Sequence, residues 1–222
     1  MKKKGLLTLI GIVIGIVLLG WLGVRLLGRP APQELVAHGL QRLNGAASFR
    51  YSMTENQWID GKERTLTQIQ GEKDGGNSHI SGQLVGSNVD MILAGGAFYN
   101  KDPFSKKWVR LANTPGAEKV FLAELDPLSS LQLKETGEVV LKGQEKLSGV
   151  PVWVCQFKPT VQDQVMEEFW QDFAYTLYIR QSDGMIVKAA IEAKSKAKSQ
   201  VMHLTLQFAD FGQKFKIQPP SV

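Results

Sequence analysis

The sequence predicts a mainly β protein with some helix (α+β): one large curved antiparallel sheet covered by helices, plus an N-terminal transmembrane helix. Three observations support this expectation. An uninterrupted apolar run occupies residues 6–24. Short runs in which apolar and polar residues alternate, separated by turn signals, then fill most of the chain. One stretch with helical spacing precedes these runs and two more interrupt them, and all three are available to cover one face of the sheet.

The apolar run from Leu6 to Val24 contains no charged residue. A run of about 18 or more apolar residues can cross a bilayer as a helix. The run is longer than the apolar region of about 7–15 residues in a secretory signal, and no small-residue cleavage site follows it. An uncleaved signal anchor is therefore favoured over a cleaved signal peptide.

Three lysines precede this run and two arginines follow it, so the positive-inside rule places the N-terminus in the cytoplasm. We expect a single-pass cell-membrane protein, with residues 1–29 as a cytoplasmic stub and anchor. Residues 30–222 then form one extracytoplasmic domain. The five basic residues beside the anchor account for the formal charge of +5, since the remaining chain carries 21 basic and 21 acidic residues. A neutral domain argues against a nucleic-acid partner.

The domain begins with helical spacing over residues 34–43, which Asn44 and Gly45 end. From Ser48 the period changes from about 3.6 to about 2 residues, as in a half-buried strand. Further strands are expected at residues 65–72, 78–85, 89–93, 97–99, 108–111, 138–142, 150–158, 175–180, 185–194 and 200–211. The short turns between them indicate sequential antiparallel pairing.

A sheet of about ten to twelve strands normally curls, and its inner face then needs cover. We expect that inner face to carry apolar residues from the first and last strands: Phe49, Tyr51, Met53, Leu204, Leu206 and Phe208. Two helical stretches are expected inside the domain, at residues 116–131, broken by Pro127, and at residues 160–173. The apolar stripe of the second is explained either by simple packing on the sheet or by capping of a hydrophobic cavity.

No catalytic, metal or cofactor site is predicted. His38, His79 and His203 share no ligand spacing, and neither a nucleophile elbow nor a phosphate-binding glycine motif occurs. Cys155 is the single cysteine, so an intramolecular disulfide is impossible, and its place in an alternating run indicates a buried structural residue. We therefore expect a binding protein and not an enzyme.

Three segments resemble lipoprotein-carrier proteins of the LolA/LolB and LppX/LprG type. Residues 149–159 (GVPVWVCQFKP) resemble their central strand, residues 178–188 their substrate-facing hairpin, and residues 206–220 their closing strand and tail. The resemblance implies a half-barrel with helices plugging its mouth, around a cavity that holds acyl chains or another hydrophobic ligand. Members of this family are soluble or held by a lipidated cysteine, whereas this chain has a transmembrane run.

The leading hypothesis is a membrane-anchored domain that binds lipid or lipoprotein at the cell envelope. The six inner-face residues would line the cavity, and the lid would consist of Phe121, Leu125, Met166, Phe169 and Trp170. The alternative is a protein-interaction or sensor module of the envelope that uses the same fold with a filled core.

Overall fold

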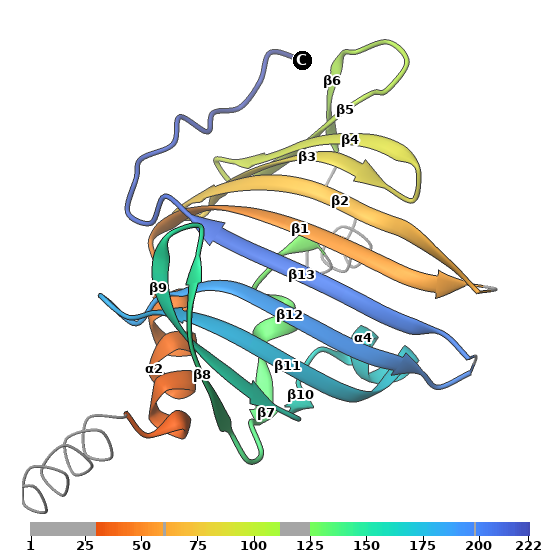
Figure 1. Ribbon diagram of the computed structural model, residues 1–222. Helices are drawn as coiled ribbons and strands as arrows, with labels where there is room; N and C mark the ends of the chain where they lie inside the picture. The colour runs from red at the N-terminus through yellow and green to blue at the C-terminus, as the bar shows by residue number, and fades with distance from the viewer. Residues whose placement is uncertain (1–29, 60, 112–124, 198) are drawn as a thin grey trace, which may run out of the picture.

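An 11-stranded antiparallel sheet organises the residues that the computed structural model describes, which are 30–59, 61–111, 125–197 and 199–222 (Figure 1). The strand order is β6-β5-β4-β3-β2-β1-β13-β12-β11-β9-β8. The strands are β1 (Ser48–Ile59), β2 (Lys62–Asp74), β3 (Asn77–Leu84), β4 (Ser87–Ala94), β5 (Ala97–Lys101), β6 (Trp108–Leu111), β8 (Val140–Leu147), β9 (Val150–Phe157), β11 (Trp170–Arg180), β12 (Ile186–Ser195) and β13 (Val201–Ala209).

Strands β1 and β13, the first and last along the chain, lie side by side in the middle of the sheet. Tyr51 pairs with Phe208 and Met53 with Leu206, so these side chains share one face. All six residues expected on the inner face are buried, and Phe49 and Leu206 are completely so. The predicted inner face is therefore confirmed as a buried surface.

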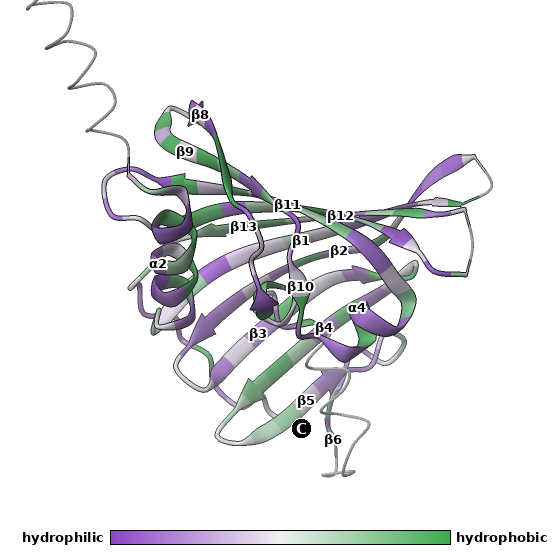
Figure 2. Cartoon of the chain, turned by 90° about the horizontal axis from the view of Figure 1, so that it is seen from below, coloured by the Kyte–Doolittle hydropathy of each residue, from purple (hydrophilic) through white to green (hydrophobic). Residues whose placement is uncertain are grey.

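Helices cover this face at both ends of the strands. Helix α2 (Pro32–Asn44) packs against β11 and β12 at one end, where its residues Val36 and Leu43 are buried. Helix α4 (Gln164–Phe169) lies at the other end, and Figure 2 shows α2, β10 and α4 on the same side of the sheet. Between them run the 3₁₀ helix η1 (Ser129–Leu131) and a two-stranded sheet made of β7 (Leu133–Glu135) and β10 (Thr160–Val161).

The helix expected at residues 160–173 is much shorter than predicted. Only Gln164–Phe169 is helical, Thr160 and Val161 form β10, and Trp170 already begins β11. Apolar residues at 169, 170 and 173 fit a helical period, but 173 also begins the two-residue period that continues through Tyr175, Leu177 and Ile179. The pairing of β11 with β12 is irregular between Gln171 and Ala174, where the helical period gives way to the strand period. This irregularity lets the side chain of Phe173 point into the core.

The other helix expected inside the domain spans residues 116–131, of which 116–124 lie outside the described residues. In the described remainder, the chain forms a turn at Pro127 followed by η1. The anchor is also untested, because Leu6–Val24 falls within residues 1–29. None of the helices in the described ranges has the length and apolar character needed to cross a bilayer.

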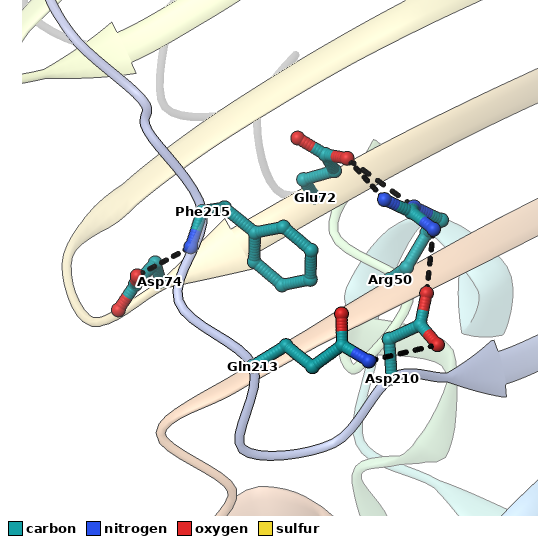
Figure 3. A network of polar contacts seen from close by, with 6 residues as sticks. All are labelled: Arg50, Glu72, Asp74, Asp210, Gln213 and Phe215. Carbon is teal, nitrogen blue, oxygen red and sulfur yellow. Dashed lines mark hydrogen bonds and ion pairs between the residues drawn. The ribbon is translucent and has the colours of Figure 1, made fainter.

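The C-terminal tail after β13 is held on the outer face of β1 and β2 (Figure 3). Arg50 donates hydrogen bonds to Glu72 at 2.8 Å and to Asp210 at 2.5 Å. The ring of Phe215 lies 5.4 Å from this guanidinium, and the backbone N–H of Phe215 donates to Asp74 at 2.9 Å. The tail therefore lies on the side of the sheet opposite to α2 and α4.

Candidate functional site

A cavity of about 260 Å³ lies between the inner face of the sheet and its cover, at the end of the strands where α4 packs. Its floor includes Met53 of β1 and both Met202 and Leu204 of β13. Its cover includes Leu125 together with Met166 of α4 and Trp170 of β11. The floor residues point inward because they occupy alternate positions of paired strands.

The structure brings together five of the residues expected at the site. Met53 and Leu204 from the expected lining meet Leu125, Met166 and Trp170 from the expected lid around this cavity. Whether a ligand contacts them is a matter for experiment, so their binding role stays a prediction. The arrangement does show that the strand face and the covering segment meet at a hollow and not only at a filled core.

The other expected lining residues lie elsewhere on the same face. Phe49 packs edge-on against Phe208, with ring centroids 5.7 Å apart, and lies 6.2 Å from the ring of Tyr51. These rings, together with the completely buried Leu206, fill the core and do not line the cavity. The inner face is therefore filled around these three rings and Leu206, and it is hollow around Met53, Met202 and Leu204.

One of the expected lid residues does not contribute to the cavity wall. Phe169 ends α4 and is 61% exposed, and it does not line the cavity. Its exposure follows from the shortness of α4, since Trp170 turns into β11 immediately after it. Phe121 lies outside the described residues.

The covering segment is tied to the sheet by two buried tyrosines. The hydroxyl of Tyr51 donates to the carbonyl of Leu125 at 3.2 Å, and that of Tyr175 donates to the carbonyl of Ser130 at 2.7 Å. Burial raises the pKa of both phenols above the ordinary value, because it disfavours the charged form. Segment 125–131 is therefore fixed at both ends by neutral hydrogen-bond donors.

Helix α4 is held by its own cap and by one ion pair. Asp163 accepts hydrogen bonds from the backbone N–H groups of Val165 at 2.9 Å and Met166 at 3.0 Å. Glu167 accepts a hydrogen bond from Lys134 at 2.7 Å, and this bond holds the pKa of the Glu167 carboxyl below its usual range. Both partners of this pair are about half exposed, so the contact positions α4 without contributing much stability.

Sequence reasoning missed a carboxylate at the cavity wall. Glu55 lines the cavity as the next inward position of β1 after Phe49, Tyr51 and Met53, so the two-residue period could have found it. It faces Thr67 across the β1–β2 pair, and the Thr67 hydroxyl donates to it at 3.5 Å. Three further wall residues had no such signal: Leu66 of β2, Leu84 at the end of β3 and Val85 of the turn that follows it.

A larger hollow of about 550 Å³ lies on the opposite, outer face near β8, β9, β11 and β12. Its wall mixes charges of both signs, from Glu138, Lys142, Lys158 and Glu192. Such a wall does not suit a hydrophobic ligand, which is bound best by apolar walls with few polar groups. The inner cavity is therefore the candidate site.

The metal-binding and reactive side chains in the part of the chain that the structure describes do not cluster at either hollow. In the described ranges, no group of three or more His, Cys, Asp or Glu residues is placed to hold a metal ion. His79 instead lies 2.9 Å from Asp90 on neighbouring strands. Cys155 is completely buried, as expected, and burial raises the pKa of its thiol to about 11. A thiol with so high a pKa is a structural residue, since the thiolate is the reactive form.

The architecture is similar to two solved mycobacterial structures. The lipoprotein LppX from Mycobacterium tuberculosis is 14% identical, with a TM-score of 0.58 over 85% of this chain and 100% of LppX. LprF from Mycobacterium bovis is also 14% identical, with a TM-score of 0.61 over 87% of this chain and 99% of LprF. No protein-family model matches the sequence, and no curated protein matches it. The chain therefore has the LppX-type fold that the sequence resemblance implied.

Proposed function

We propose that this chain is a membrane-anchored extracytoplasmic protein that binds an alkyl chain of a lipid or lipoprotein in the inner cavity. The observation that carries the proposal is the cavity itself, in which Met53 and Leu204 of the sheet face Leu125, Met166 and Trp170 of the cover. Burying an alkyl chain there is favourable by about 0.8 kcal/mol for each CH₂ group removed from water. The role is binding and not catalysis.

The size of the cavity limits what it holds. A dry apolar cavity of about 150 Å³ is enough for benzene, and pockets for drug-sized ligands occupy about 300–1,000 Å³. A volume of about 260 Å³ lies between these values and suits a segment of one alkyl chain. A longer or branched lipid requires α4 to move outward, which breaks the ion pair of Glu167 with Lys134.

Attachment and orientation rest on the apolar run Leu6–Val24 and its flanking charges. The similar protein LppX is named a lipoprotein, which is in keeping with a place at a membrane. Orientation is tested with Ser105→Cys, which places a thiol at an exposed position while the native Cys155 stays buried. A membrane-impermeant maleimide should label this variant in intact cells and leave the wild type unlabelled. Labelling that requires permeabilised cells would overturn the extracytoplasmic assignment.

The binding function is tested by native mass spectrometry of the full chain extracted in detergent. Met166→Trp places a bulky indole ring in the cavity, whereas Glu168→Trp places the same ring at an exposed position of α4. We expect the wild type and Glu168→Trp to carry a lipid that Met166→Trp lacks. If no form of the protein carries lipid, the interaction or sensor module becomes the better reading. Equal lipid in all three forms would move binding away from this cavity.

A further inference from the structure

The polar part of the cavity wall is acidic. Of the described residues that line it, five have polar side chains: Glu55, Thr67, Ser129, Ser130 and Asp163. Two of these are carboxylates, and none of the described wall residues is Lys, Arg or His. A ligand in the cavity therefore meets negative charge and no cation from this part of the chain.

The hydroxyl donors of the described wall residues are already engaged with protein acceptors. The Ser129 hydroxyl donates to the Asp126 carbonyl at 2.8 Å, and the Ser130 hydroxyl donates to the Pro127 carbonyl at 3.3 Å. The Thr67 hydroxyl points to Glu55, with 3.5 Å between the oxygens. At the start of α4, the backbone N–H groups of Val165 and Met166 donate to the side chain of Asp163. Among the described wall residues, what remains for a ligand is the acceptors and one side-chain donor, the indole N–H of Trp170.

Glu55 is the acceptor with the most remaining capacity next to the apolar floor. It is opposite Leu204 in the β1–β13 pair and two residues from Met53 on the same face. Its Oε1 accepts from the Gln57 amide at 2.7 Å, and among the described residues Oε2 receives only the long contact from Thr67. A carboxylate offers about four lone-pair sites, so unused sites remain for a ligand.

We propose that the cavity selects an alkyl chain whose polar end donates hydrogen bonds, an alkyl ammonium above all, and that Glu55 is the residue that sets this specificity. The inference rests on the proposed function, since it concerns the ligand of the same cavity. An ammonium brings three donors and a charge opposite to Glu55. A chain ending in a carboxylate or phosphate finds no cation among the described wall residues, and both carboxylates, Glu55 and Asp163, repel it.

The test compares three ligands with one chain length and different ends: dodecylamine, dodecanol and dodecanoate. The full chain is reconstituted in bilayer nanodiscs of phosphatidylcholine, and its thermal unfolding is followed with each ligand at equal concentration. A ligand that binds the folded state raises the midpoint, and at equal concentration a tighter ligand raises it more. We expect the largest rise with dodecylamine, a smaller rise with dodecanol and none with dodecanoate.

Glu55→Gln removes the charge while keeping the shape, and Glu63→Gln removes the same charge from an exposed residue that does not line the cavity. A charge-assisted hydrogen bond lost from the site corresponds to weaker binding by about tenfold or more. Glu55→Gln should therefore bind dodecylamine at least about tenfold more weakly, with dodecanol little changed, while Glu63→Gln behaves like the wild type.

Each result decides between the two proposals. Stabilisation by dodecanoate equal to that by dodecylamine would overturn the specificity and leave alkyl-chain binding intact. An equal loss in Glu63→Gln would show that the preference comes from general surface charge and not from Glu55. No stabilisation by any of the three ligands would overturn the proposed function itself. The comparison of ligands in the wild type decides the specificity even if Glu55→Gln does not fold.

Discussion

The phenolic oxygen of Tyr175 lies 2.7 Å from the carbonyl oxygen of Ser130, so a buried strand residue holds the segment that closes the cavity. Tyr51 makes the matching contact to Leu125 from the other half of the sheet. Both tyrosines stand on the inner face, and Ser130 and Leu125 are themselves buried. The cover is therefore attached to the sheet through its backbone, independently of the side chains that line the cavity.

The contribution of this attachment is measurable with Tyr175→Phe. Loss of the hydroxyl leaves the Ser130 carbonyl buried without its donor, which costs about 1–3 kcal/mol. We expect the free energy of unfolding in urea to fall by that amount, and the amides of residues 125–131 to exchange hydrogen faster. Tyr178→Phe is the matched control, because Tyr178 is a half-buried residue on the outer face of the same strand. Equal effects of the two substitutions would contradict an attachment role for Tyr175.

Burial of these phenols also predicts an alkaline limit to stability. The pKa of Tyr51 and of Tyr175 is raised in the folded state, whereas an unfolded tyrosine titrates near a pKa of about 10. Above that pH the unfolded chain releases protons that the folded chain retains, so stability falls as pH rises. Each tyrosine contributes up to about 1.4 kcal/mol per pH unit to this loss.

The comparison that isolates this effect is the urea unfolding free energy of the wild type and of Tyr175→Phe, measured from neutral pH to above pH 10. Lysine titration is common to both proteins and cancels in the difference. The wild type should lose stability more steeply than Tyr175→Phe above a pH of about 10. Parallel curves would contradict the raised pKa of Tyr175.

The strands that form the cavity floor were predictable because the alternation of apolar and polar residues lies within each strand. Phe49, Tyr51 and Met53 alternate with polar residues, and so do Leu204, Leu206 and Phe208, which fixes the face that each side chain occupies. The pairing of β1 with β13 is not local, and the sequence, which indicated only sequential antiparallel pairing, did not predict it. Only that pairing makes the two sets one continuous surface.

The hollow itself could not be read from the sequence. It depends on α4 being one short helix, whereas the period of residues 160–173 indicated a long one. It also depends on how the sheet curls, which brings Leu84 at the end of β3 and Val85 of the following turn to the same wall as Met166. Such contacts between distant segments leave no periodic signal in either segment, because each one is satisfied by a partner far away in sequence.

The position of the Tyr51 ring depends on the absence of a side chain at Gly71. Gly71 pairs directly with Tyr51 across β1 and β2, and a Cβ atom at Gly71 would overlap the ring. Gly71→Ala must therefore displace Tyr51 and its hydrogen bond to Leu125. Overpacking of this kind costs about 1–3 kcal/mol.

Gly76→Ala is the matched control, because a Cβ atom at Gly76 meets nothing within 4 Å. We expect urea unfolding to show a loss of stability for Gly71→Ala and little change for Gly76→Ala. The double variant Gly71→Ala with Tyr51→Phe should lose less than the sum of the two single changes, since both remove the same hydrogen bond. Full additivity would show that Gly71 acts on stability by a route other than the Tyr51 ring.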